Sequence, residues 1–109
     1  MSKVMQEHYL VVYQNFEDFF ERLEYLKSQA LDGKYLYKTK DRKLILKTKY
    51  GAQKCYYFMC FSGDIDRFIE YIAGGQFVAP IYLEGDYPSR LINFVLSRCR
   101  GGVWEAEEI

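Results

Sequence analysis

The fold is decided by residues 34–61, KYLYKTKDRKLILKTKYGAQKCYYFMCF. Lysines alternate here with aromatic, aliphatic and β-branched residues in three short stretches, at about residues 34–40, 43–50 and 54–61. Such a period of two, bounded by turn-forming residues, is typical of strands. We expect Asp41-Arg42 to form a two-residue turn and residues 50–53 a four-residue loop. The three strands then form an antiparallel sheet.

Hairpin closure at these turns fixes which side chains share a face of the sheet. The first turn pairs Lys40 with Lys43, and the second pairs Lys49 with Lys54. Successive side chains of a strand point to opposite faces, so one face collects basic and aromatic residues. We predict that the binding residues of this face are Lys34, Lys38, Lys40, Lys43, Lys47, Lys49, Lys54, Tyr56 and Phe58. The opposite face, with Leu44, Leu46, Cys55 and Tyr57, is the predicted core face.

The segments outside this stretch predict three helices and further strands. Residues 8–13 (HYLVVY) read as a buried strand, and Asn15 offers an N-cap for a helix that ends near Gly33. A second helix is expected at 62–73, ended by the glycines 74–75, and a third at 88–100, ended by the glycines 101–102. Residues 77–83 are a further strand candidate, and 103–109 an edge strand or a frayed end.

The predicted order is therefore β-α-β-β-β-α-β-α. We expect one compact α+β domain spanning residues 1–109, in which the helices pack on one face of a mainly antiparallel sheet. No internal repeat or Pro/Ser-rich linker divides the chain.

The formal net charge of zero conceals a strong asymmetry along the chain. Residues 34–54 carry eight basic residues against one acid, a net charge of +7, whereas residues 1–33 carry −3 and residues 55–109 carry −4. No apolar run approaches the roughly 20 residues of a membrane span, and the N-terminus lacks the apolar core of a signal peptide. Three cysteines do not suggest a disulfide framework. We therefore expect no membrane partner and a cytoplasmic location.

The predicted basic face places like charges directly across strands, and such pairs cost stability. Three interpretations account for this face. The lysines can be solvated or paired with acids of the same chain. They can neutralise the phosphates of a nucleic acid, with Tyr56 and Phe58 stacking on bases. They can also meet an acidic protein partner.

Residues 54–61, KCYYFMCF, resemble the signature octapeptide of RNA recognition motif domains. The first, third, fifth and eighth positions match in type, and the resemblance implies that Lys54, Tyr56 and Phe58 face RNA. Cys55 and Tyr57 stand where that family has small residues. The run of helix, three strands and helix at 15–73 also resembles the Alu-RNA-binding proteins of the signal recognition particle.

The sequence offers little for catalysis or metal binding. His8 is the only histidine and adjoins an apolar strand, and Cys55 and Cys60 point to opposite faces of one strand. No phosphate-binding loop and no nucleophile with a neighbouring base is present. We predict no catalytic residues, no metal site and no cofactor.

Two functions from different classes follow from these observations. The first is a small non-enzymatic protein that binds RNA or single-stranded nucleic acid through its basic sheet face. The alternative is an adaptor or inhibitor that acts by protein–protein contact, supported by the 11 tyrosines and by Trp104 near a Glu-rich end. Self-association into a homodimer, the basic middle of one copy against the acidic ends of another, is a further hypothesis.

Overall fold

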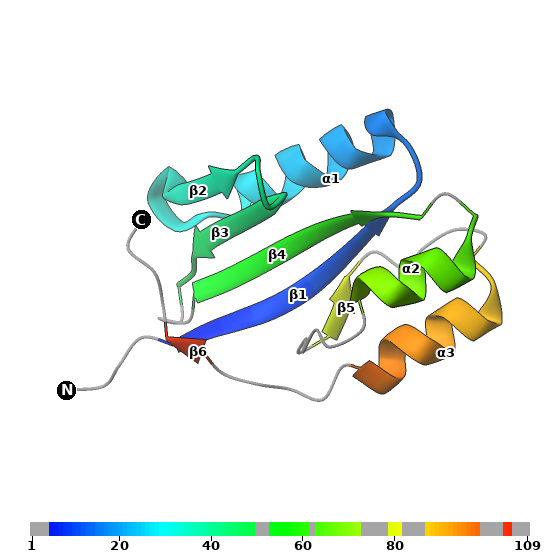
Figure 1. Cartoon of the computed structure of the whole chain (residues 1–109). Helices are drawn as coiled ribbons and strands as arrows, with labels where there is room; N and C mark the ends of the chain where they lie inside the picture. The colour runs from blue at the N-terminus through cyan, green and yellow to red at the C-terminus, as the bar shows by residue number, and fades with distance from the viewer. Residues whose placement is uncertain are drawn as a thin grey trace.

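The sheet is mixed, with parallel pairing at its centre and antiparallel pairing to one side. The structure, a computed structural model, describes residues 5–49, 53–61, 63–72, 79–81, 87–98 and 104–105. The elements are β1 (Met5–Tyr13), α1 (Phe16–Ser28), a short 3-10 turn η1 (Leu31–Gly33), β2 (Tyr35–Lys38), β3 (Lys43–Lys47), β4 (Gln53–Cys60), α2 (Ile65–Ile72), β5 (Ala79–Ile81), α3 (Ser89–Arg98) and β6 (Trp104–Glu105). The strand order is β2-β3-β4-β1-β5, and β6 also pairs with β1 (Figure 1).

The α+β class and the order of elements are confirmed for the described residues. The β2–β3 and β3–β4 pairs are antiparallel, as expected. At the centre, however, β1 runs parallel to β4, from Gln6↔Gln53 to Tyr13↔Cys60, and parallel to β5. Parallel neighbours need a long crossover, and α1 with the β2–β3 hairpin supplies it between β1 and β4.

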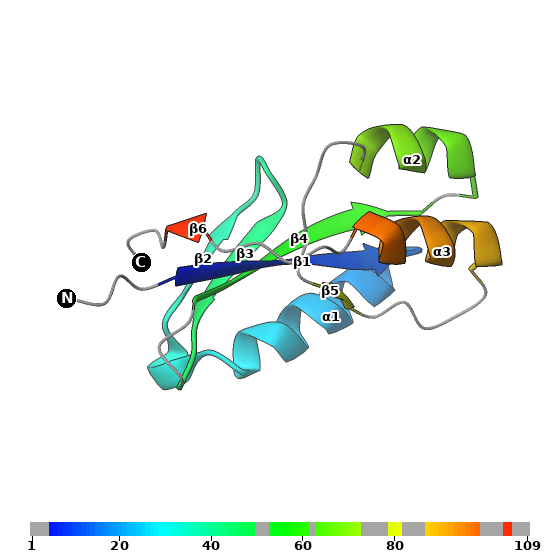
Figure 2. The same cartoon turned by 90° about the horizontal axis from the view of Figure 1, so that it is seen from below.

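The helices cover both faces of the sheet, so the expectation that they pack on one face is wrong. α1 lies on one face, and α2 and α3 lie on the other (Figure 2). The cause is β1, whose side chains are buried on both sides. Leu10 and Val12 belong to the apolar cluster under α2 and α3, and Val11 and Tyr13 to the cluster under α1. A continuous apolar run is typical of such a central strand.

The predicted helix starts are confirmed where they are described. The Asn15 side chain accepts a hydrogen bond of 2.8 Å from the Asp18 backbone N–H, which caps α1. The Asp64 carboxylate caps α2 in the same way, at 3.1 Å from the Arg67 N–H. After α1 the chain turns through Asp32 and Gly33, both with positive φ. The glycines expected to end α2 and α3 lie outside the described residues.

The pairing registers differ from those expected, with unequal consequences. β2 and β3 pair Lys38 with Lys43 rather than Lys40 with Lys43, a shift of two residues that leaves every side chain on its predicted face. β3 and β4 pair Lys47 with Gln53 and Lys43 with Tyr57, three residues away from the expected register. An odd shift exchanges the two faces of a strand, so β4 is turned over relative to the prediction.

No described helix is long and apolar enough to cross a membrane. Of the cysteines among these residues, Cys55 is buried and Cys60 is exposed, and neither forms a disulfide.

Candidate functional site

Three of the predicted lysines share one face of the β2–β3 hairpin. Lys38 and Lys43 are opposite each other in the ladder, and Lys47 lies further along β3 on the same side. These three lie on the face opposite α1, since Leu44 and Leu46, the intervening residues of β3, are buried under α1. The Lys43 ammonium group lies 5.8 Å from the centre of the Tyr57 ring, which is on the same face. Lys47 is exposed, and Lys38 and Lys43 are half-buried.

The lysines outside the strands extend this basic region. Lys34 precedes β2, Lys40 lies in the hairpin turn and Lys49 follows β3, and all three are exposed. Together with Lys38, Lys43 and Lys47 they form what we call the basic hairpin. Within the described part of the chain, Lys34, Lys40, Lys47 and Lys49 make no ion pair.

Lys54 lies on the other face of the sheet. It lies opposite Glu7 in the ladder of β1 and β4. Its ammonium group lies 5.5 Å from the centre of the Tyr9 ring. The Tyr9 ring in turn stacks on Tyr56. The structure therefore does not bring Lys54 together with the basic hairpin.

Tyr56 and Phe58 are buried under α1, contrary to the face predicted for them. They are 4% and 3% exposed, and the Phe58 ring meets the Phe19 ring edge to face with centres 5.3 Å apart. The odd register shift of β4 places them in the core, and neither ring is accessible for stacking on a base. The resemblance of residues 54–61 to the RNA recognition motif octapeptide thus reflects a buried aromatic strand.

Among the described residues, the ion pairs of the helices do not involve Lys34, Lys40, Lys47 or Lys49. α2 and α3 lie over the C-terminal ends of β1 and β4, beside the hairpin and not over it (Figure 2). The apolar cluster beneath α2 and α3 contains no residue of β2 or β3. Acids of the helices pair with helical bases: Asp18 with Arg22, Glu24 with Lys27, and Asp66 with Arg90.

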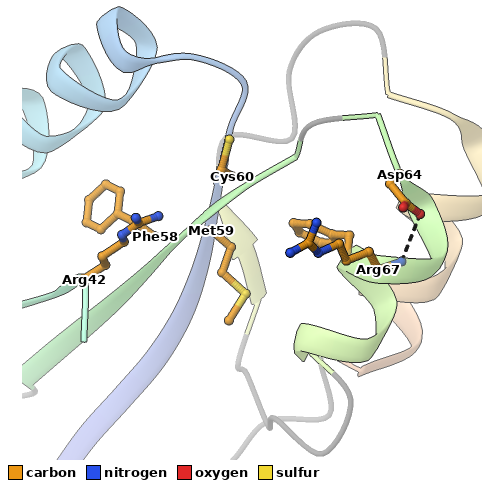
Figure 3. A pocket seen from close by; sticks show the side chains of 7 residues that line it. Arg42, Phe58, Met59, Cys60, Asp64 and Arg67 are labelled. Carbon is orange, nitrogen blue, oxygen red and sulfur yellow. Dashed lines mark hydrogen bonds between the residues drawn. The ribbon is translucent and has the colours of Figure 1, made fainter. Parts of the chain in front are cut away.

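A second feature, which the sequence did not predict, is a cavity of about 460 Å³ beside the C-terminal part of β4. Arg42 reaches it from the hairpin turn on one side of β4, and Arg67 reaches it from α2 on the other (Figure 3). The remaining lining side chains come from β4, from α2 and from its cap, and are Phe58, Met59, Cys60, Asp64 and Phe68. The cavity thus joins two arginines from distant parts of the chain.

The cavity lies at the open edge of β4, where the hairpin turn adjoins the strand on one side and α2 follows it on the other. Residues 58–60 of β4 extend beyond the β3 ladder at this edge. The sequence showed only that Arg42 lies in a turn, and the parallel neighbours were not foreseen.

Arg42 is held in place by its contacts with the core. Its guanidinium group donates a 2.8 Å hydrogen bond to the Tyr13 hydroxyl, and its carbonyl accepts a 3.0 Å bond from the Phe58 N–H. Burial raises the pKa of Tyr13 above its usual 10.0, and the nearby Arg42 charge offsets part of that rise. Tyr13 is therefore a neutral phenol at physiological pH. Its hydroxyl accepts a hydrogen bond from the Arg42 guanidinium group and does not form an ion pair with it.

Among the described residues, no three His, Cys, Asp or Glu side chains gather closely enough to hold a metal ion. Comparisons of the chain with protein-family models, with curated proteins and with solved structures found no match. Any argument about function therefore rests on the basic hairpin and the cavity themselves.

Proposed function

We propose that the protein binds RNA or single-stranded nucleic acid through the basic hairpin. The observation that carries the proposal is the set of four exposed lysines, Lys34, Lys40, Lys47 and Lys49, which make no ion pair in the described part of the chain. Lysines gathered on a hairpin neutralise phosphates and release condensed counterions, which is the main source of sequence-independent affinity for nucleic acids.

The contacts of this proposed interface are mainly with phosphates. Tyr56 and Phe58 are buried, and the aromatic side chain on the hairpin face, Tyr57, is half-buried beside Lys43. Stacking on bases therefore contributes less than in the interface expected from the sequence. Since phosphate contacts carry no sequence information, we expect binding that depends strongly on salt and weakly on sequence.

The test is a fluorescence anisotropy titration with a labelled single-stranded RNA of about 15 nucleotides, close to the length of strand that a small domain covers. We expect binding that weakens steeply between about 50 and 200 mM salt. The double variant Lys47→Glu/Lys49→Glu is expected to weaken binding by about tenfold or more and to flatten the dependence on salt.

The matched control compares Lys47→Glu with Arg90→Glu, which makes the same change in charge on an exposed side chain of α3, away from the hairpin. We expect Arg90→Glu to retain most of the affinity. Equal loss in both single variants would show that only net charge matters, and an absence of binding at low salt would refute the proposal.

One observation favours the alternative of a protein-binding function. Phe16 and Phe20 on α1 are 70% and 45% exposed, and their rings touch edge to face with centres 4.5 Å apart. Exposed aromatic pairs are enriched where proteins meet. α1 lies on the face of the sheet opposite the lysines Lys38, Lys43 and Lys47 (Figure 2). A protein partner at α1 and a nucleic acid at the hairpin would therefore use different surfaces.

A homodimer is the protein–protein alternative that can be tested with the purified protein alone. Light scattering would give the mass of the protein and of the Phe16→Ser/Phe20→Ser variant, each at low and high salt. A dimer that the variant abolishes at both salts points to the aromatic pair. A dimer lost only at high salt points to charge pairing between the basic hairpin and acidic segments.

A further inference from the structure

The arginine-lined cavity combines features that a small anionic ligand needs. Its volume of about 460 Å³ falls within the range of roughly 300–1,000 Å³ typical of small-molecule sites. Its walls are of two kinds, apolar side chains from β4 and α2 and charged groups near the edge of the sheet. Such sites bind the body of a ligand by apolar contact and orient it through a few polar groups.

The charged groups favour an anion. Arg42 and Arg67 contribute two positive charges, and Asp64 contributes one negative charge. An oxygen of the Asp64 carboxylate already accepts the capping bond from the Arg67 N–H, whereas the Arg67 side chain makes no ion pair in the described part of the chain. Guanidinium groups bind phosphate oxygens through forked, charge-assisted hydrogen bonds, and both arginines line this cavity.

The edge of β4 adds to this arrangement. β3 begins at Lys43, which pairs with Tyr57, so residues 58–60 of β4 extend beyond the β3 ladder. The Phe58 N–H is used by the Arg42 carbonyl, and after that bond the strand edge runs along the cavity between the two arginines (Figure 3). Arg42, at the end of the hairpin turn, thus lines the cavity immediately before Lys43 of the basic hairpin.

We propose that this cavity binds the phosphate monoester of a ligand of mononucleotide size, with Arg42 and Arg67 on the phosphate and Met59 and Phe68 against the apolar body. The choice of a nucleotide as the carrier of the phosphate rests on the proposed function. The phosphate can belong to a free nucleotide or to the 5′ end of a strand held by the basic hairpin. A smaller cavity of about 300 Å³ near α1 has the opposite character, since Glu17, Asp18 and Glu21 line it.

The thiol of Cys60 provides a local readout of occupancy, because it lines the cavity and is exposed. The experiment measures its rate of alkylation by mass spectrometry of the peptide that contains it, with AMP, adenosine or inorganic phosphate present. We expect AMP to slow alkylation at least about fivefold at saturation, and adenosine to have no effect at the same concentration. Buried Cys55 serves as an internal check that the fold is intact.

Variants then assign the effect to the arginines. Arg67→Gln, at an exposed position, is expected to weaken AMP binding by about tenfold or more, as is typical for the loss of a charge-assisted hydrogen bond. Arg42→Gln should do the same, and circular dichroism would show whether loss of its bond to Tyr13 disturbs the fold. Arg90→Gln, the exposed arginine of α3 outside the cavity, should bind AMP as the unaltered protein does.

Two oligonucleotides that differ only in a 5′ phosphate or 5′ hydroxyl distinguish the two sources of the phosphate. Tighter binding of the phosphorylated strand, lost in Arg67→Gln, identifies a strand terminus, whereas protection by AMP alone identifies a free nucleotide. The proposal is overturned if AMP protects Cys60 no better than adenosine or inorganic phosphate, or if Arg67→Gln binds AMP normally. RNA binding that survives this result, and that is lost in Lys47→Glu/Lys49→Glu, would leave the function of the basic hairpin standing.

Discussion

At the scale of single residues, Tyr56 and Phe58 show how far an alternating pattern can be read. The pattern correctly predicted that they lie on one face of a strand, and that Cys55 and Tyr57 lie on the other. It did not predict which face meets the hairpin lysines, because both faces of β4 are apolar and both are buried in part. Only the length of the loop before β4 fixes that choice, and one odd shift reverses it.

The burial of Phe58 leads to a stability prediction that separates the two registers. Phe58→Ala should lower the free energy of unfolding by about 3–5 kcal/mol, since the ring is 3% exposed and packs on Phe19. The control Phe16→Ala, at a ring that is 70% exposed, should change it by no more than about 0.5 kcal/mol. Urea unfolding measures both free energies. A small effect of Phe58→Ala would contradict the observed register and support the one expected from the sequence.

The buried tyrosines predict a loss of stability in alkali. Burial raises the pKa of Tyr9, Tyr13 and Tyr87 above the usual 10.0, so the folded protein favours the neutral phenol. Their contribution is fully present below pH 10.0 and is lost as pH rises from there through the higher pKa of the folded state. Urea midpoints at several pH values should therefore fall above about pH 10. Tyr87→Phe should show a smaller fall, and an unchanged alkaline limb in that variant would contradict this assignment.

At the scale of elements, local signals were sufficient for the helices. Asn15 caps α1 as expected, and Asp64, within the expected start of the second helix at 62–73, caps α2. The existence of β2, β3 and β4 was likewise predictable from alternation. The parallel neighbours β1 and β4 were not, because their pairing joins segments more than 40 residues apart and has no local signature. The cavity was also missed, because it brings Arg42 and Arg67 together from distant segments and likewise has no local signature.

The cap of α1 yields a prediction in which two asparagines behave oppositely. Asn15→Ala should destabilise the protein by about 1 kcal/mol, because the Asp18 N–H loses its acceptor. Asn93, an exposed residue within α3, has no such role, and Asn93→Ala should be neutral or slightly stabilising because alanine has the higher helix propensity. Thermal unfolding of the two variants side by side tests the pair. Equal losses would mean that the cap contributes nothing specific.

At the scale of the whole molecule, the basic middle segment and the paired acids of the described flanks occupy different parts of the fold. Acids of the flanking segments lie on α1 and α2, where Asp18, Glu24 and Asp66 pair with helical bases. The basic middle forms the hairpin at the side of the sheet. A net charge of zero therefore does not imply an electrostatically neutral surface, and it leaves the hairpin able to attract an anion.

We expect the same architecture to make the two helical layers a single cooperative unit. β1 contributes Leu10 and Val12 to one apolar cluster and Val11 and Tyr13 to the other, so neither layer can separate without exposing the central strand. Leu91→Ala, at a fully buried residue of α3, should lower the global free energy of unfolding by about 2–5 kcal/mol. Hydrogen exchange should report the same loss at Leu44 in β3, which packs under α1 on the opposite face.

A matched control for this prediction lies on the same helix. Leu96 is 52% exposed, and Leu96→Ala should leave the protection of both layers within about 0.5 kcal/mol of the unaltered protein. If Leu91→Ala instead loosened only the amides of α2 and α3 while Leu44 kept its protection, the two layers would unfold separately. β1 would then be held mainly by its packing on α1 and its pairing with β4.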